Sequence, residues 1–574
     1  MRLADPRRRL RVSFLLICVL VSLLVGRVVQ LQGFEASRFA EAASGINVRD
    51  VVLPAQRGAI VDRNGKVLAQ SVDAVDIIAD QQVVTEAGNV AAYALELAPI
   101  LDKDAAILQR ELTGDSRYHY LAKSVAPDAW NEIKDHDLAG IFAEPASERI
   151  YPSGAVAGNV LGFTGADGNG LAGLELASQN LLAGEDGSMT YQATRTDVRI
   201  PLGSGNRDEP TAGQSLQLTL DRDIQWYAEN AIADAVASAN AAGGNVVVMD
   251  VYTGEILAMA TAPVVDPERP GATETGERGN RVVEEVYEPG SVFKAITMAA
   301  VVDQGMAGPR TAFTVPDNLS RGSEVVNDYW DHGPEQFTLS GIVARSSNVG
   351  SILAAERVDA EVFGDYVRRF GFGTALGLGL PAEAGGRLPE QWSGLDRDYA
   401  AFGQGISVTT VQLASAYATI ANGGVRMPPK LVSATMTEDG EREDISPTGE
   451  PSRVISEEAA AAVTTMLETA MGPDGTGRNV GVDGYRVAGK TGTAQRIDPG
   501  CGCYADYNAS FVGFAPVENP RFAVAVSLLD PKNGNSGGTL AGPVFQDVMG
   551  FTLQTMGIAP SGSEPPDLPP LTAG

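Results

Sequence analysis

The chain has 574 residues, of which 44% are hydrophobic and 20% are charged, so it has the composition of a globular protein with room for two or more domains. Its formal net charge of -29 argues against a nucleic-acid or anionic-lipid partner, because both would repel it. Three cysteines are too few for a disulfide framework, and three histidines leave little material for imidazole catalysis or a histidine-based metal site.

The amino terminus predicts a single membrane anchor. Arginines at positions 2, 7, 8, 9 and 11 precede an apolar segment, and residues 10–31 would span roughly 33 Å as a helix, which is enough for a bilayer core. A cleaved signal peptide is the alternative, but the nearest small-x-small site, residues 40–42, lies far beyond the apolar segment. We therefore expect a cytoplasmic tail at residues 1–11, an uncleaved anchor at 12–32, and the rest of the chain outside the cell.

Residues 33–211 are predicted to form a first domain that mixes strands and helices. Turn signals such as Arg63-Asn64-Gly65 are frequent in it, and a polar stretch over residues 203–211 marks its end. A second domain is expected over residues 212–556. The remaining residues, 557–574, are rich in proline, serine and glycine, so we expect a disordered tail.

In the second domain, strands are predicted near both ends and helices between them. Residues 215–221 lead into a helical pattern over 224–240, and residues 245–260 predict a β-hairpin that turns at Thr253-Gly254. Residues 291–470 have mostly helical periodicity, and three further strands follow in YRVAGKTGTAQ, NASFVGFAP and RFAVAVSLLD. This order predicts one α+β domain whose sheet is built from both ends of the domain.

The first candidate site lies in YEPGSVFKAITMAAVVDQG, where Ser291 and Lys294 stand three positions apart at the start of an apolar helix. Positions three apart share a helix face, so the lysine would lie beside the serine. A serine hydroxyl needs a base to become a nucleophile, and a buried lysine can be that base because burial lowers its pKa. The plain alternative is a capping serine followed by a surface lysine.

Two further motifs follow in the chain. Ser346 and Asn348 form an S-x-N motif at the start of another helical segment, where a helix cap is the structural alternative. Lys490, in VAGKTGT, lies in an apolar strand flanked by glycines, and Gly492 would let another group approach the backbone closely. Its structural alternative is an edge strand protected by a charge. The order S-x-x-K, S-x-N, K-T-G is the signature of serine enzymes that react with penicillin.

With these motifs the chain resembles the class B penicillin-binding proteins, the membrane-anchored peptidoglycan transpeptidases. RGAIVDRNGKVLA and RIYPSGAVAGNVLGFTGADGNGLAGLE look like signatures of the family's pedestal domain, and GQGISVTTVQLASAYATIANGG resembles a further family stretch, with Thr410 where the family often has proline. The likeness is to the septal, FtsI-type enzymes, and GTAQRIDPGCGCYADYNASFVGFAP looks like their actinobacterial form. The resemblance covers nearly the whole chain.

The resemblance implies a fold and a set of residue roles. The fold would be the penicillin-binding serine transpeptidase fold, an antiparallel sheet flanked by helices with a helical subdomain, preceded by an elongated mixed pedestal of the dimerisation type and one transmembrane helix. The residues that it implies are the nucleophile Ser291, its base Lys294, the proton relay Ser346, the amide-binding Asn348, the positive Lys490, and the carboxylate-binding segment Thr491, Gly492 and Thr493. Backbone N–H groups of Ser291 and Thr493 would form the oxyanion hole.

The resemblance also implies substrate and partners. The substrate would be the D-Ala-D-Ala stem peptide of peptidoglycan, cross-linked at the division septum, and β-lactams would be covalent inhibitors. A polytopic membrane glycosyltransferase and other cell-division proteins are the expected partners. A D,D-carboxypeptidase and a non-catalytic division scaffold are the main alternatives. A serine β-lactamase would lack the pedestal, a penicillin-sensing receptor would need a cytoplasmic output domain, and a Ser-His-Asp enzyme would need a histidine near the motifs.

Other residues are left open by the sequence. Cys501 and Cys503 could form a strained disulfide across one glycine or remain thiols, and two thiols alone make a poor zinc site, so we expect no metal and no cofactor. The segment from Asp328 to His332 could line the cleft or only pack a loop. Arg57 and Glu175 of the pedestal signatures are expected to be structural.

Overall fold

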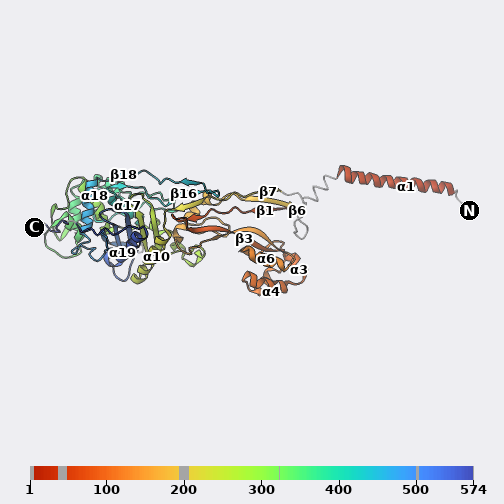
Figure 1. Ribbon diagram of the computed structural model, residues 1–574, viewed down its shortest axis with the longest axis horizontal. Helices are drawn as coiled ribbons and strands as arrows, with labels where there is room; N and C mark the ends of the chain where they lie inside the picture. Colours follow the sequence, from red (N-terminus) through yellow and green to blue (C-terminus); the bar gives the residue numbers. More distant parts are fainter. Residues whose placement is uncertain are drawn as a thin grey trace. The chain divides into compact units, whose positions relative to one another are not determined.

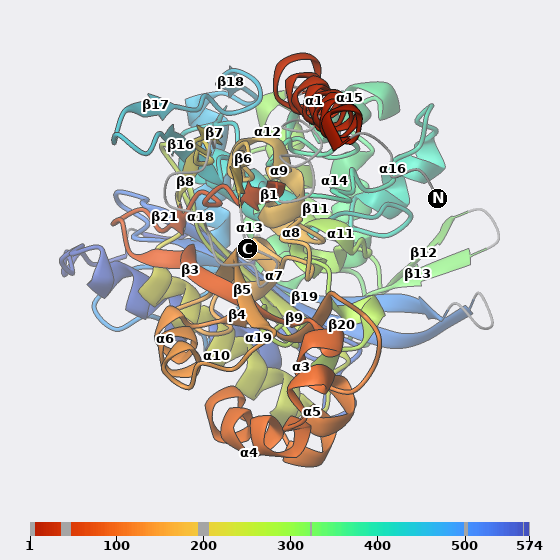
Figure 2. The same ribbon diagram turned by 90° about the vertical axis from the view of Figure 1, so that its right-hand side faces the viewer.

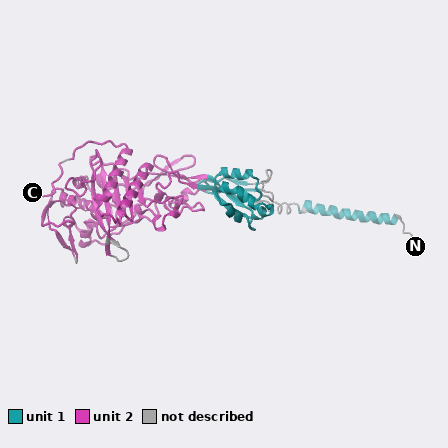
Figure 3. Cartoon of the chain, turned by 90° about the horizontal axis from the view of Figure 1, so that it is seen from below, with its two compact units in different colours: residues 1–56, 73–148, 185–211 teal, residues 57–72, 149–184, 212–574 magenta. Residues whose placement is uncertain are grey.

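The computed structural model describes residues 6–35, 48–192, 206–321, 324–498, 503–565 and 567–572 (Figure 1). The chain divides into two compact units, each discontinuous in sequence (Figure 3). Unit 1 comprises residues 1–56, 73–148 and 185–211, and unit 2 comprises residues 57–72, 149–184 and 212–574. Two segments of the expected first domain, residues 57–72 and 149–184, therefore cluster with the second.

The amino-terminal helix α1 (Pro6–Val29) continues into a short π-helix, η1 (Gln30–Phe34). The most apolar 18-residue window of the helix over Arg7–Gly33 has a mean hydropathy of 2.6, and no residue of that window is buried. Among the described residues it is the one helix long and apolar enough to cross a membrane. A fully exposed apolar helix of this length fits a membrane anchor, as the sequence predicts.

The described part of unit 1 contains strands of two sheets and a group of short helices. One sheet is antiparallel with the order β1-β6-β7, and in the other β3 pairs antiparallel with β4 and also pairs with β5. The bounds of these strands are β1 Val48–Leu53, β3 Val67–Ala79, β4 His119–Val125, β5 Ile141–Ile150, β6 Gly187–Gln192 and β7 Asn206–Asp208. The helices are α3 Gln81–Ala87, α4 Val90–Leu101, α5 Ala105–Glu111 and α6 Pro127–Asp135. Buried Leu97, Leu108 and Leu121 hold helices and strands in one apolar cluster.

Unit 2 is organised around a five-stranded sheet with the order β10-β9-β21-β20-β19. The strands are β9 Gly243–Asp250, β10 Ile256–Ala262, β19 Ala488–Asp498, β20 Cys503–Ala515 and β21 Phe522–Leu529, and all neighbours are antiparallel. The predicted α+β domain is thus confirmed, because the hairpin near its start pairs with the strands near its end. Every residue of β9, β10 and β21 is buried.

Helices cover both faces of this sheet. Alternate residues of β9 enter different cores. Val246 and Val248 pack with α10 (Arg222–Ala239) and α19 (Gly537–Thr555), whereas Val247 packs in the cluster that contains residues of α12 (Lys294–Asp303) and α17 (Thr410–Ala421). This alternation follows from the two-residue period of a strand. The helix α19, which the sequence interpretation did not predict, contains Pro543 and several glycines.

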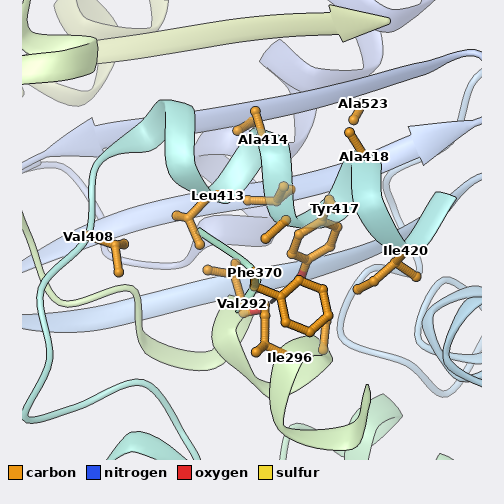
Figure 4. Close-up of a cluster of buried hydrophobic side chains, with 14 of the residues drawn as sticks. Val292, Ile296, Phe370, Val408, Leu413, Ala414, Tyr417, Ala418, Ile420 and Ala523 are labelled. Carbon is orange, nitrogen blue, oxygen red and sulfur yellow. Dashed lines mark hydrogen bonds between the residues drawn. The ribbon is translucent and has the colours of Figure 1, made fainter. Parts of the chain in front are cut away.

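The face of the sheet opposite α10 and α19 carries α17 (Thr410–Ala421), in which every residue is buried. Its Tyr417 ring lies beside Phe370 and donates a hydrogen bond from its hydroxyl to the carbonyl of Val292 at 2.7 Å (Figure 4). The helix begins with a capping box between Thr409 and Gln412. The hydrogen bond from Tyr417 to Val292 ties α17 to the residue that follows Ser291.

Shorter elements surround this framework. In unit 2, β2 pairs in parallel with β8, with Ile60 opposite Leu216, which is why residues 57–72 belong to this unit. The short strands are β2 Ile60–Val61, β8 Ser215–Leu218, β11 Ala312–Val315, β12 Asn318–Arg321, β13 Glu324–Asn327, β14 Glu335–Thr338, β15 Val425–Arg426, β16 Val432–Met436, β17 Arg442–Asp444 and β18 Ser452–Arg453. The remaining helices are α7 Gly158–Leu161, α8 Gly173–Ala177, α9 Gln179–Leu182, η2 Pro270–Ala272, η3 Thr275–Glu277, α11 Arg281–Glu284, η4 Gly290–Phe293, α12 Lys294–Asp303, α13 Leu339–Arg345, α14 Asn348–Ala355, α15 Ala360–Arg369, α16 Gly394–Ala400 and α18 Glu457–Thr469. The hairpins β12–β13 and β19–β20 both project from the body of the unit (Figure 2).

Arg57 and Glu175 are structural, as their buried contacts show. The Arg57 Nε donates to Glu175 Oε2 at 2.6 Å, and Arg149 Nε donates to the other carboxylate oxygen at 2.8 Å. The Glu175 side chain is fully buried between the two guanidinium groups. A buried carboxylate with two such partners holds residues 149–184 against residues 57–72.

The carboxyl-terminal tail differs from the expectation of disorder over residues 567–572. Leu571 packs against the large core of unit 2, and its carbonyl accepts a hydrogen bond from the Thr338 backbone N–H at 3.0 Å. Gly341 in α13 makes room for it, since a Cβ there would come within 1.9 Å of the Leu571 oxygen. One apolar side chain and a backbone hydrogen bond thus hold a segment whose composition alone indicates disorder.

Candidate active site

Ser291 lies in the short 3-10 helix η4, immediately before α12. Gly290 has a φ of +59°, and Gly403 packs so closely that a Cβ on it would lie 2.1 Å from the Gly290 carbonyl oxygen. The two glycines are therefore required for the tight turn that presents the serine. Ser291 is partly exposed, whereas Lys294, the first residue of α12, is completely buried. The serine is reachable by a substrate and the lysine is not.

The Lys294 amine lies within hydrogen-bond distance of oxygens of Ser291, Ser346 and Asn348. Its Nζ lies 3.0 Å from the Ser291 Oγ and 2.8 Å from the Asn348 Oδ1. It also lies 2.6 Å from the carbonyl oxygen and 3.2 Å from the Oγ of Ser346. Two predicted motifs, far apart in sequence, thus meet at one amino group.

The environment of Lys294 prepares it to act as a base. Burial lowers its pKa to about 7, and the negative charge of Asp328 opposes that effect. A large fraction of the side chains is then neutral at neutral pH. A neutral amine at 3.0 Å from the Ser291 Oγ can accept the hydroxyl proton, which an ordinary charged lysine cannot do.

Ser346 lies between the two buried lysines. It follows α13 and has the left-handed backbone conformation, with a φ of +61°, which is uncommon for a residue other than glycine. Its Oγ is 3.2 Å from Lys294 Nζ and 2.9 Å from Lys490 Nζ. Strained backbone of this kind clusters at functional sites, and here it aims the hydroxyl at both amines.

Lys490 and its neighbours lie in β19, which is an edge strand of the five-stranded sheet. The Lys490 amine is fully buried, and its pKa lies well below the ordinary value, first because of burial and then because of Lys294. Gly492 fits only as glycine, since a Cβ would come within 2.2 Å of the Ser510 Oγ, as the sequence predicts for a close approach. Thr493 is exposed, and its Oγ1 accepts a hydrogen bond from the Gly537 N–H at 3.4 Å.

Two contributions to the site escaped the sequence interpretation. The Thr491 hydroxyl donates to the Thr476 Oγ1 at 3.0 Å, although Thr476 lies in a loop that carries no motif of its own. Gly403 was recognised only as part of a longer family stretch, and its positive φ of +85° and its contact with Gly290 could not be inferred from spacing.

The segment between the first two motifs lies behind the site. The Asp328 side chain is fully buried and accepts hydrogen bonds from the Ser347 hydroxyl at 2.6 Å and from the Val349 N–H at 3.1 Å. His332 contacts the same carboxylate at 3.2 Å, while Tyr329 is 69% exposed. The loop therefore packs against the S-x-N motif, which was the structural alternative for these residues.

Ser347, Asp328 and His332 do not form a Ser-His-Asp catalytic arrangement. The Ser347 hydroxyl donates to the carboxylate and not to the imidazole, and its Oγ also accepts the Gly350 N–H at 2.8 Å as a helix cap. Ser347 is completely buried, so no substrate carbonyl can reach it.

Among the described residues no group of three or more His, Cys, Asp or Glu could hold a metal ion. Cys501 lies outside the residues that the structure describes, and Cys503, at the start of β20, is disulfide-bonded.

Family models match most of the chain. Residues 244–550 match the penicillin binding protein transpeptidase domain, and residues 52–218 match the penicillin-binding protein dimerisation domain.

Relatives of known name are similar over nearly the full length. The penicillin-binding protein PbpB of Mycobacterium tuberculosis is 37% identical over 92% of this chain and 82% of its own. The peptidoglycan D,D-transpeptidase FtsI of Escherichia coli is 34% identical over 96% of this chain and 92% of its own. Among solved structures, a peptidoglycan synthetase from Bifidobacterium adolescentis has a TM-score of 0.73 with 33% identity and covers 92% of this chain with all of its own length. Penicillin binding protein 3 from Mycobacterium tuberculosis, in complex with aztreonam, has a TM-score of 0.70 with 33% identity, over 91% of this chain and all of its own.

Proposed function

The chain belongs to the class B penicillin-binding proteins, and from that membership we propose that it is a peptidoglycan D,D-transpeptidase that cross-links stem peptides through an acyl-enzyme on Ser291. The observation that carries the assignment of the nucleophile is the 3.0 Å contact of its Oγ with Lys294 Nζ, in surroundings that lower the lysine pKa to about 7.

The first half-reaction uses Lys294 and Ser346. Lys294 takes the proton of the Ser291 hydroxyl while the oxygen attacks the carbonyl carbon of the penultimate D-Ala. The C–N bond to the terminal D-Ala then breaks, and the leaving amine receives a proton through the Ser346 hydroxyl, which lies 3.2 Å from Lys294 Nζ. The terminal D-Ala departs, and the rest of the stem peptide remains as an ester on Ser291.

The second half-reaction reverses the proton path. The amine of a neighbouring stem peptide attacks the ester carbonyl, its proton passes to Lys294, and the Ser291 oxygen recovers a proton as the C–O bond breaks.

Asn348, whose Oδ1 is 2.8 Å from Lys294 Nζ, would hold the substrate amide. Thr491 and Thr493, with Gly492 between them, would hold the terminal carboxylate of the donor peptide before the terminal D-Ala leaves. Lys490, 2.9 Å from the Ser346 Oγ, would act beside them.

Backbone N–H groups of Ser291 and Thr493 would stabilise the oxyanion of each tetrahedral intermediate. A donor of this kind lowers the barrier by ~3 kcal/mol in comparable sites. The location of Ser291 at the start of a helical segment supports this role, because helix amino termini favour negative charge.

The relatives also suggest where the enzyme acts and with what. Penicillin binding protein 3 of Mycobacterium tuberculosis has been solved with aztreonam and with ampicillin, so we expect β-lactams to acylate Ser291 as well. We place the catalytic unit outside the cytoplasm, on an anchor formed by α1 with a cytoplasmic amino terminus. The FtsI name of one relative supports a septal role, with a polytopic glycosyltransferase and other division proteins as partners.

The test uses the full-length chain in detergent, incubated with a fluorescent penicillin and then analysed by intact mass. We expect one covalent adduct in the wild type, none in Ser291→Ala, and an unchanged adduct in the control Ser393→Ala, which changes an exposed helix cap outside the site. An unlabelled but folded wild type would overturn the assignment in favour of a non-catalytic scaffold.

A second assay separates transpeptidase from D,D-carboxypeptidase. A pentapeptide ending in D-Ala-D-Ala is supplied with a fluorescent D-amino acid as acceptor. Incorporation of the fluorophore into the peptide supports acyl transfer to amines, whereas release of D-Ala with no incorporation would assign the chain as a carboxypeptidase.

A further inference from the structure

A buried acid and a buried histidine lie directly behind the S-x-N motif, and neither takes part in the proposed mechanism. The side chains of Asp328 and His332 are 0% and 2% exposed, and Asp328 Oδ2 lies 3.2 Å from His332 Nε2. The His332 ring stacks on Trp330, with centroids 4.9 Å apart, and its edge faces Phe337 at 6.2 Å. A polar pair this well enclosed is held in one arrangement by its aromatic surroundings.

Hydrogen bonds surround both members of the pair. Asp328 accepts from the Ser347 hydroxyl and from the backbone N–H groups of Asn348 and Val349, so both of its oxygens act as acceptors. The other ring nitrogen of His332, Nδ1, lies 2.7 Å from the carbonyl oxygen of Gly333. Both ring nitrogens therefore lie within hydrogen-bond distance of oxygens, and an imidazolium would donate to both.

The pair is connected to the catalytic amine by a short path. Asp328 holds the first backbone N–H groups of α14, and the first residue of that helix, Asn348, places its Oδ1 2.8 Å from Lys294 Nζ. Asp328 is also the negative group that opposes the effect of burial on the pKa of Lys294. The titratable groups near the amine are thus Asp328, His332 and Lys490, together with the neutral Ser291, Ser346 and Asn348.

We propose that Asp328 and His332 form a buried ion pair that positions the Ser346–Asn348 segment and fixes the negative charge that Lys294 faces. His332 limits the field of Asp328 at the lysine, and Asp328 fixes the start of α14. Both are positioning residues, since neither touches the substrate. This inference rests on the proposed function, because it concerns the base of that reaction.

The test is the pH dependence of acylation by a fluorescent penicillin, measured on the full-length chain in detergent. In the wild type we expect the rate to rise with pH to a midpoint set by Lys294. Asp328→Asn removes the negative charge and should shift this midpoint to lower pH by about one pH unit, with a lower plateau rate. His332→Phe keeps an aromatic ring between Trp330 and Phe337 but removes the positive charge, so the midpoint should move to higher pH.

A matched control separates position from loss of stability. Asp303→Asn removes a carboxylate from the same helix as Lys294, where it accepts the Tyr366 hydroxyl at 2.6 Å and the Ser456 N–H at 2.7 Å. It should lower the melting temperature and leave the midpoint unchanged.

Opposite shifts in the two test variants support the ion pair. Equal midpoints in wild type, His332→Phe and Asp303→Asn overturn it even if Asp328→Asn does not fold. Failure of the wild type to acylate overturns the proposed function and this inference together, whereas acylation with unmoved midpoints overturns the inference alone.

Discussion

Lys294→Met should make the protein more stable at neutral pH, although it removes the proposed base. The pKa of Lys294 is lowered from 10.5 to about 7 in the folded protein. Between these two values the unfolded chain binds a proton that the folded chain lacks, so the free energy of unfolding rises with pH across this window. Below it, the folded protein bears the full cost of burying the charge.

The size of the effect follows from the two pKa values. At pH 7 the buried lysine costs about 4 kcal/mol, and at pH 9 about 2 kcal/mol, because most unfolded lysines are still charged there while the folded one is neutral. Methionine has a similar length and no charge, so the variant avoids this cost at every pH. It also loses the hydrogen bonds to Ser291, Ser346 and Asn348, which offsets part of the gain.

The difference in unfolding free energy between Lys294→Met and wild type should therefore shrink by about 2 kcal/mol from pH 7 to pH 9. Lys490 contributes in the same direction. Lys294 is one cause of its lowered pKa, so replacing Lys294 by methionine also reduces the cost of burying the Lys490 amine. Urea unfolding of the full-length chain in detergent, followed by tryptophan fluorescence, measures this difference. Ser291→Ala keeps the lysine and should follow the wild type. A difference that stays constant between pH 7 and pH 9 would refute a charge-burial cost at Lys294.

Other substitutions test the framework of the site. Gly403→Ala should abolish penicillin labelling or reduce it at least about tenfold, because its Cβ would collide with the turn before the nucleophile, whereas Gly271→Ala, with open space around it, should label normally. Arg57→Met leaves the buried Glu175 with one cationic partner and should lower the unfolding free energy by about 3 kcal/mol, measured by denaturant titration. Leu571→Ala should lower the melting temperature, with a loss of about 2 kcal/mol, and an unchanged value would mean that the tail does not pack in solution.

The local parts of the fold could be predicted from the sequence. The hairpin at Thr253-Gly254 has its turn residues between two apolar segments, and the structure pairs Val247 with Met259 there. The pairing of Ser291 with Lys294 follows from helical spacing in the same way. In both cases, residues close in sequence determine the contact.

What the sequence could not show depends on distant contacts. Ile60 pairs with Leu216, so a segment assigned to the first domain by its place in the chain belongs to the second unit. The helix α19 was missed because Pro543 and the glycines around it lower helix propensity, while burial against α10 stabilises it. The roles of Asp328 and His332 depend on which residues surround them, and no spacing rule describes that.

The strand order of unit 2 also has a consequence for biosynthesis. β9 pairs with β21 along its whole length, yet the ribosome makes β21 only after all the residues between Asp250 and Phe522. During that interval the apolar strands β9 and β10 have no third strand, and loop closure across so long a segment is slow. The nascent chain therefore carries unpaired apolar strand edges for much of its synthesis, a state in which aggregation competes with folding. Destabilising changes between the two strands should accordingly reduce the yield of folded protein more than the activity of each molecule that folds.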